Sequence, residues 1–382
     1  MTGRRVVLAL HDAGGTVPPM LAIAEELAAR GHAVTVLGQR GIERRARRVG
    51  ADFVAFAIPD YATDRPIEEQ IEAVVPMMTG RGPGDELLRT MEAADADVVV
   101  VDANLAGVAA AAAASGRPSA LLLHSLFETY VDTWFGELWP FLAPLINETR
   151  AAFGLAEGSS WNEIFEPHDR LVAAVPEPFD APTSVAPPAT LRHAGFLVPS
   201  ATAAGPDAAI ELGRCDEPTV LVSLSTTDMG QAPLLQTILD ALGGLDVRGI
   251  VTTGGQRFGP SLRVPANVVV HDYLAHAAVL PHADAVVTHA GLGTVAAALD
   301  HGVPIVCTPI ARDQPLNAAR VAEVGAGVVV PAATATADQV RAALHEVLTD
   351  TRHRQGAERV AAASARAGGA AGVADDLEHL SR

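Results

Sequence analysis

The feature that most restricts the fold is a rhythm of short apolar runs, each followed by a helical stretch rich in Ala, Leu and Glu. The runs are Val/Leu/Ile-rich without polar alternation, which is typical of parallel strands covered on both faces. The sequence therefore predicts an α/β protein with parallel sheets. The expected strands are residues 6–10, 33–37, 53–56, 98–102 and 120–124, then 219–224, 249–253, 268–271, 285–288, 304–308 and 326–330.

The chain has 382 residues, too many for one ordinary hydrophobic core. A stretch rich in Pro, Ala and Ser, residues 175–209, separates the two sets of expected strands. We place the domain boundary near residue 205, so that residues 1–205 and 206–382 form two Rossmann-like domains facing across a cleft. Whether the last helix packs back on the N-terminal domain is left open.

Charge and composition exclude several functions. The formal net charge is −18 and the chain contains no lysine, which excludes a lysine nucleophile or Schiff base and argues against a nucleic-acid partner. The two cysteines, Cys215 and Cys307, are too few for a disulfide framework and fit a reducing compartment. No segment reaches the roughly 18 apolar residues of a membrane span, so we expect a soluble, cytoplasmic protein.

Polar side chains gather where the expected strands end, and ligands of open α/β sheets bind beyond these carboxyl ends. In the first half these residues are His11, Asp12, Asp102 and His124. In the second half they include Ser225, Thr226, Thr253 and His289. The strand ends of both halves therefore predict a ligand site.

The segment 283–321 carries the sharpest signal. A strand ends at His289, glycines follow, and a helix opens near Thr294, where free backbone amides can bind an anion. A later strand delivers Asp313 and Gln314, a carboxylate and an amide that suit sugar hydroxyls. A diphosphate beside a sugar is a nucleotide sugar.

This segment resembles the donor-binding signature of GT-B glycosyltransferases of the natural-product and UDP-glycosyltransferase type. That signature is roughly H-x-G-x-G-S/T-x-x-E-A, then G-x-P, then D-Q-x-x-N-A. The chain departs from it at Ala297, where the family usually has Glu. The matching residues are His289, Gly291, Gly293, Thr294, Ala298, Gly302, Pro304, Asp313, Gln314, Asn317 and Ala318.

The resemblance implies an inverting, metal-independent glycosyltransferase that needs no cofactor and uses an NDP-sugar as donor. It implies that His289, Gly291, Gly293 and Thr294 hold the diphosphate and that Asp313 and Gln314 hold the sugar. The nucleotide would lie near Ser225, Thr226, Thr253, Tyr273 and Leu274. The lysine-free composition, rich in Ala and Arg, is typical of a high-GC bacterium. In such bacteria, enzymes of the resembled family commonly transfer deoxysugars from dTDP donors. By this association we expect a dTDP-deoxysugar as donor and a small hydrophobic natural product as acceptor, as in antibiotic biosynthesis.

The sequence offers several candidates for the catalytic base. The turn that carries it in the resembled family has Thr16 here, and a threonine hydroxyl is no useful base near neutral pH. The family's orienting carboxylate matches Asp102. His124 with Asp102 is the preferred pair and His11 is next, with Asp12 as a further candidate. The alternatives are turn-capping roles for His11 and Asp12, an acceptor so acidic that Thr16 only orients it, or binding without transfer.

An aromatic cluster follows the fifth expected strand and is a candidate acceptor pocket. Plain core packing is an equal alternative, and a membrane-surface patch is a third. Its members are Phe127, Tyr130, Trp134, Phe135 and Trp139.

Other interpretations are weaker. Asp95 and Asp97 imitate a metal-binding DxD motif but precede their strand, so we expect them on the surface and expect no metal site. Gly291-x-Gly293-x-x-Ala296 fits a dinucleotide fingerprint, but no acidic residue ends the following strand. A sugar-nucleotide 2-epimerase and a degenerate sugar-nucleotide-binding partner protein remain alternatives. A homodimer is left open.

Overall fold

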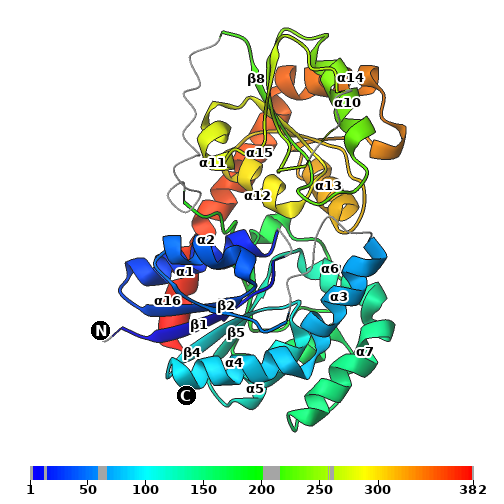
Figure 1. The fold of residues 1–382 in the computed structure, drawn as a ribbon. Helices are drawn as coiled ribbons and strands as arrows, with labels where there is room; N and C mark the ends of the chain where they lie inside the picture. The colour runs from blue at the N-terminus through cyan, green and yellow to red at the C-terminus, as the bar shows by residue number, and fades with distance from the viewer. Residues whose placement is uncertain are drawn as a thin grey trace. The chain divides into compact units, whose positions relative to one another are not determined.

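The computed structural model describes residues 3–12, 15–58, 67–200, 216–256, 258 and 262–380. They form two compact units, Met1–Ala203 with Arg366–Arg382 and Ala204–Ala365, each built on a parallel sheet covered by helices (Figure 1). The predicted α/β class with two parallel-sheet domains is confirmed. The predicted boundary near residue 205 lies outside the described residues.

The first unit has a seven-stranded parallel sheet in the order β3-β2-β1-β4-β5-β6-β7. Val6 of β1 is in register with Val34 of β2 on one side and Val98 of β4 on the other. The strands are β1 (Arg5–Ala9), β2 (Ala33–Gly38), β3 (Asp52–Ala55), β4 (Val98–Asp102), β5 (Ser119–Leu123), β6 (Arg170–Ala173) and β7 (Leu191–His193).

Alternate side chains of these strands feed two hydrophobic layers, as strand geometry requires. Val6 and Leu8 pack under α1, α2 and α16, whereas Val7 and Ala9 pack under the helices of the opposite face. The helices of the unit are α1 (Val17–Ala29), α2 (Glu43–Arg48), α3 (Ile67–Thr79), α4 (Arg81–Ala93), α5 (Ala106–Ala114), α6 (Phe127–Val131), α7 (Trp134–Ala152), α8 (Trp161–Phe165) and α16 (Gly369–His379).

The second unit has a six-stranded parallel sheet in the order β10-β9-β8-β11-β12-β13. Val220 and Val222 of β8 pack under α10 and α14. Its strands are β8 (Thr219–Ser223), β9 (Arg248–Thr252), β10 (Val268–His271), β11 (Ala285–Thr288), β12 (Ile305–Cys307) and β13 (Gly327–Val329). Its helices are α10 (Ala232–Leu242), α11 (His276–Val279), α12 (Leu292–Asp300), α13 (Gln314–Glu323), α14 (Ala337–Thr349) and α15 (Thr351–Ala367). The last two residues of α15 already belong to the first unit. Single 3-10 turns occupy Arg40–Ile42, Glu177–Phe179, Leu280–His282 and Ala332–Thr334.

All eleven predicted strands are present, with bounds within one residue of those expected. The sequence missed β6 and β7. Both are short, and β7 is an edge strand within a proline-rich stretch that resembles a linker by composition.

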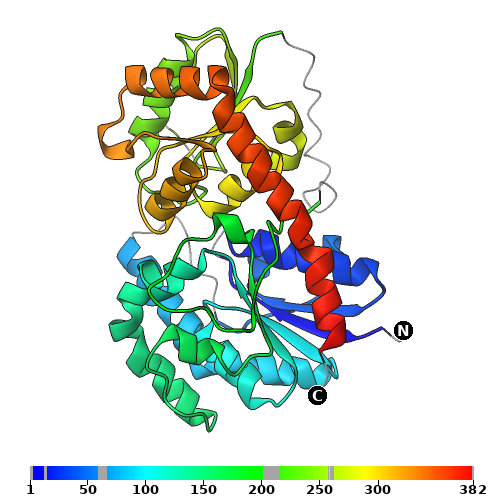
Figure 2. The ribbon, with the colours of Figure 1, turned by 180° about the vertical axis from the view of Figure 1, so that it is seen from behind.

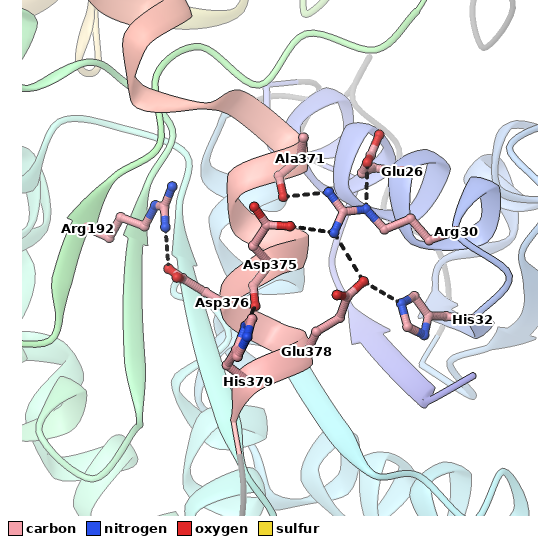
Figure 3. Close-up of polar contacts among 9 residues, drawn as sticks. All are labelled: Glu26, Arg30, His32, Arg192, Ala371, Asp375, Asp376, Glu378 and His379. Atoms are coloured by element: carbon pink, nitrogen blue, oxygen red, sulfur yellow. Dashed lines mark hydrogen bonds and ion pairs between the residues drawn. The ribbon is translucent and has the colours of Figure 1, made fainter. Parts of the chain in front are cut away.

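The last helix, α16, belongs to the first unit and lies beside α1 (Figure 2). Arg30 at the end of α1 binds Asp375, Glu378 and the carbonyl of Ala371, and His32 Nε2 lies 2.8 Å from Glu378 Oε1 (Figure 3). On the other side of the helix, Arg192 pairs with Asp376 at 2.7 Å (Figure 3). The C-terminal segment is therefore an integral part of the N-terminal unit.

Candidate active site

The first sheet reverses its strand order between β1 and β4, which is where open α/β sheets bind ligands. Three predicted catalytic residues follow strands at this point. His11 lies two residues beyond β1, Asp102 is the last residue of β4, and His124 comes directly after β5. The topology therefore brings together residues that are far apart in the sequence.

The carboxylate of Asp102 lies between the two imidazoles. Its Oδ2 is 3.3 Å from His11 Nδ1 and its Oδ1 is 3.4 Å from His124 Nδ1. Asp102 and His11 are buried, whereas the side chain of His124 keeps 13 % of its surface exposed. His124 is thus the member of the cluster that a dissolved molecule can reach.

Burial opposes ionisation of Asp102, but the neighbouring His124 and His11 more than offset it, so the pKa of Asp102 lies well below its ordinary value. The backbone N–H of Asn104 also donates to Oδ1, at 3.0 Å. Asp102 is therefore an ionised carboxylate at neutral pH, suited to orienting an imidazole and stabilising its protonated form.

Asn104 and Tyr130 support His124. The Tyr130 hydroxyl donates to Asn104 Oδ1 at 2.9 Å and lies 3.5 Å from His124 Nδ1, while Asn104 Nδ2 is 3.4 Å from His124 Nε2. The sequence analysis missed Asn104, although its position two residues beyond the strand-ending Asp102 was a usable signal. These contacts hold the His124 ring at the sheet edge.

Thr16 and Asp12 hold the connection that follows β1. The Thr16 hydroxyl is buried and donates to the carbonyl of His11 at 2.5 Å. Asp12 Oδ1 forms an ion pair with Arg45 Nη2 at 3.5 Å, and the backbone N–H of Asp12 donates to Gln39 Oε1. The side chains of Thr16 and Asp12 thus make local structural contacts, and a catalytic role for either residue stays a prediction.

The aromatic cluster is mostly core. Phe127, Tyr130 and Phe135 are 2 %, 0 % and 7 % exposed, and Tyr130 stacks on Phe135 with ring centres 4.9 Å apart. Trp139 is half-buried against Trp161. The side chain of Trp134 lies outside the described residues. Phe127, Tyr130 and Phe135 are therefore core residues, as the packing alternative predicts. Tyr130 meets the candidate site through its hydroxyl and through an edge-on contact of its ring with His124, with ring centres 6.5 Å apart.

The second sheet reverses its order between β8 and β11, and the predicted diphosphate site lies there. His289 follows β11, Ala290 adopts a left-handed conformation (φ 65°), and Gly291 caps α12. A Cβ at position 291 would lie 2.6 Å from His289 Nε2, so only glycine fits beside this ring. Gly293 is exposed and has open space at its Cβ position, so a ligand can approach the start of α12, Thr294 included.

His289 is 9 % exposed, and its Nδ1 lies 3.3 Å from Thr288 Oγ1. Burial lowers the pKa of His289 to about 4, and the same cause lowers that of His276 to about 4. His276 Nε2 lies 3.1 Å from Ser223 Oγ. At neutral pH both imidazoles are uncharged, so His289 can offer a hydrogen bond but no full charge.

Asn317 links two loops of this site. Its buried Nδ2 donates to the carbonyl of Ala290 and to Asp313 Oδ2, each at 3.0 Å. Gln314 Oε1 accepts from the backbone N–H groups of Ile310 and Ala311. Asn317 was part of the matched signature but was not selected as a site residue, and it ties the Asp313 loop to the turn that opens α12.

The residues predicted around the nucleotide follow β8, β9 and β10. Ser225 Oγ accepts from the backbone of Thr227 at 3.0 Å, and Thr253 Oγ1 lies 3.4 Å from the carbonyl of Asp272. Thr226 and Tyr273 are exposed, Tyr273 by 62 %, whereas Leu274 is buried. An exposed ring suits stacking on a base, and this role stays a prediction.

Among the described residues, no group of three or more acidic, His or Cys side chains is arranged to hold a metal ion. Asp95 and Asp97 pair with Arg5 before β4, at the amino end of the sheet. Burial raises the pKa of Cys307 to about 12, while Cys215 lies outside the described residues. Within the described part of the chain, no helix is long and apolar enough to cross a membrane.

Comparisons with known proteins agree with this geometry. The family model of the C-terminal domain of erythromycin biosynthesis protein CIII-like proteins matches residues 236–380. Demethyllactenocin mycarosyltransferase of Streptomyces fradiae is 30 % identical, with 96 % of this chain and 84 % of the relative covered. The chain belongs to the natural-product glycosyltransferases.

Further relatives of this glycosyltransferase point the same way. The 4'-demethylrebeccamycin synthase of Lentzea aerocolonigenes is 28 % identical over 94 % of this chain and 95 % of its own. The solved glycosyltransferase of kitacinnamycin superposes with a TM-score of 0.83 at 22 % identity, covering 99 % of both chains. The calicheamicin glycosyltransferase CalG4 gives 0.78 at 23 % identity, covering 99 % of this chain and 98 % of its own. The fold is thus GT-B, and the protein is an enzyme of sugar transfer.

Proposed function

We propose that this glycosyltransferase moves a sugar from a nucleoside diphosphate, preferably dTDP, to a hydroxyl of a small hydrophobic natural product, with inversion of configuration and without a metal. The observation that carries the proposal is the ionised Asp102 between His11 and His124 at the switch point of the first sheet. Family membership favours sugar transfer over epimerisation of the donor or binding alone.

His124 acts as the base in this mechanism. Its imidazole takes the proton of the acceptor hydroxyl as that oxygen forms a bond to the anomeric carbon of the sugar. The bond from that carbon to the β-phosphate oxygen breaks, and its electron pair leaves on the diphosphate. Asp102 stabilises the imidazolium that results, and Asn104 and Tyr130 keep the ring in place.

The donor belongs to the second unit. The start of α12 and His289 would bind the diphosphate, Asp313 and Gln314 the sugar, and the exposed Tyr273 ring the base. Relatives are named for transferring mycarosyl and desosaminyl groups, and the glycosyltransferase VinC was solved in complex with dTDP. These names support a deoxysugar donor on dTDP.

The test is a thermal-shift and calorimetric screen of dTDP, UDP and GDP against the whole protein. We expect dTDP to raise the unfolding temperature most. The variant His289→Ala should lose most of that shift, because it removes a hydrogen-bond donor at the phosphate site. His345→Ala, on α14 away from the β8/β11 switch point, is the matched control and should retain it. No stabilisation by any of the three would refute the proposed donor class.

Transfer and its stereochemistry need a separate assay. With the preferred NDP-sugar and a panel of phenols and hydroxylated macrocycles, we expect glycosides whose anomeric proton coupling, measured by NMR, shows inversion. Products that retain the donor's configuration would contradict a single displacement assisted by His124.

A further inference from the structure

Arg312 lies in the loop between β12 and α13 in an unusual backbone conformation. Its φ is +62°, a left-handed value that side chains with a Cβ rarely adopt. The surrounding loop holds it there, because Gln314 binds the N–H groups of Ile310 and Ala311 and Asp313 is tied to Asn317. Such strain is typical of functional positions, where the structure keeps a side chain in place at a cost in stability.

Arg312 as a residue is half-buried, yet within the described part of the chain its guanidinium makes no hydrogen bond or ion pair. The neighbouring carboxylate of Asp313 is directed to Asn317 instead. Other arginines of this unit are paired, such as Arg263 with Asp240 and Arg341 with Asp338. A cation left unpaired in an acidic protein is available to an anion from outside.

Arg312 also lies close to the candidate phosphate site. Its charge contributes to lowering the pKa of His289, so the guanidinium and the imidazole are electrostatic neighbours. Asn317 bonds both Asp313, next to Arg312 in sequence, and Ala290, next to His289. The loop that carries Arg312 is thus tethered to the turn that opens α12.

Among the described residues assigned to the predicted diphosphate site, none besides Arg312 carries a full positive charge at neutral pH. His289 is neutral at neutral pH, a helix start offers only about half a unit charge, and the chain has no lysine. The diphosphate of a nucleotide sugar carries about two negative charges, and it gains about one more on the β-phosphate when the sugar leaves. The net charge of −18 makes a local cation more necessary, since it repels anions as a whole.

We propose that Arg312 is the cation that pairs with the diphosphate of the donor and of the departing nucleotide. This inference rests on the proposed nucleotide-sugar site and adds to it a residue outside the matched signature. Arginine suits the role because its planar fork can donate two parallel hydrogen bonds to phosphate oxygens.

The test compares Arg312→Gln and Arg312→Gly with Arg263→Gln, a matched change at an exposed arginine of the same unit. Calorimetry with inorganic pyrophosphate, dTDP and thymidine separates phosphate from base recognition. We expect both Arg312 variants to weaken pyrophosphate and dTDP binding at least tenfold and to leave thymidine binding unchanged. Arg263→Gln should match the wild type.

The variant Arg312→Gly tests whether a loss of phosphate binding could come from damage to the loop rather than from loss of the charge. Glycine adopts φ +62° without strain, so the unfolding temperature without ligand should be equal to or higher than that of the wild type. Unchanged pyrophosphate affinity, or equal losses for thymidine and dTDP, would overturn the proposal.

The proposed function can fail separately. A wild-type protein that binds pyrophosphate but none of dTDP, UDP and GDP would refute the nucleotide donor while still testing Arg312. Binding of neither pyrophosphate nor any of these nucleotides would overturn both proposals.

Discussion

The two sheets of this protein have the same switch-point topology but present different chemistry there. At β1/β4, three strand ends place an ionised carboxylate between two imidazoles. At β8/β11, one nearly continuous segment surrounds a helix start with neutral donors, and its histidine is held uncharged by burial. The shared topology supplies a location, and the residues at the strand ends decide between proton transfer and anion binding.

The protonation states express this difference most directly. The lowered pKa of Asp102 keeps a negative charge beside the two imidazoles at neutral pH, and this charge can stabilise an imidazolium formed during transfer. The lowered pKa of His289 keeps that ring neutral, so it stays a hydrogen-bond donor without attracting a proton. Substitutions at the two points should therefore affect different measurements.

The largest expected effect is that of Asp102→Asn. The amide cannot stabilise the imidazolium, so kcat for transfer should fall by about 10²- to 10⁴-fold. The dTDP affinity should stay within about twofold, because the second unit is untouched. Asp95→Asn, at the amino end of the same sheet, is the control and should transfer normally. A drop in dTDP affinity matching the drop in kcat would break the division of roles between the units.

The second expected effect separates the two histidines. His124→Ala should lower kcat by about 10²- to 10³-fold, and the loss should shrink for acidic acceptors such as nitrophenols, which need little help losing a proton. His11→Ala should cost less activity, because His11 is buried behind Asp102. If folded His11→Ala loses more activity than His124→Ala, the assignment of the base is reversed.

The sequence predicted the residues at the β8/β11 switch point more completely than the contacts at the β1/β4 switch point, for a physical reason. The donor-side residues His289 to Gln314 fall within one stretch whose spacing is visible in the chain. The His11–Asp102–His124 cluster exists only after three strands align, so the sequence could propose its members but not their contacts. The burial of Phe127 and Phe135 was equally hidden, since an aromatic ring fits a pocket or a core. No pattern in the sequence singles out Arg312, because the proposed role rests on its left-handed backbone angle and on its lack of an ion-pair partner among the described residues.

Acid should destabilise the second unit more than the first. The second unit contains two buried histidines with lowered pKa values, whereas the described part of the first contains one, His168, whose pKa burial lowers to about 3. His276 and His289 have pKa values lowered to about 4, so their contribution to stability is lost as the pH falls from about 6.5 toward 4. Hydrogen exchange measured between pH 7 and 4.5 should show β8 and β11 losing protection before β1 and β4. The variant His276→Gln should reduce this loss by about 1–3 kcal/mol. Equal protection of both sheets at pH 4.5 would remove this contrast.

The smallest expected effect concerns the anchoring of α16 on the first unit. The hydrogen bond from His32 and that from Arg30 lower the pKa of Glu378, so its contribution is present above the unfolded-state pKa and lost as the pH falls through the folded-state pKa. All three tryptophans, Trp134, Trp139 and Trp161, belong to the first unit, so their fluorescence follows this unit selectively. Glu378→Gln should lower its stability at pH 7 by about 0.5–1 kcal/mol and flatten its decline below pH 4.5. Glu323→Gln, exposed on α13 of the second unit, should leave the tryptophan transition unchanged. If Glu378→Gln instead shifts hydrogen exchange in β8 and β11, the anchoring network couples the two units and their stabilities are not separable.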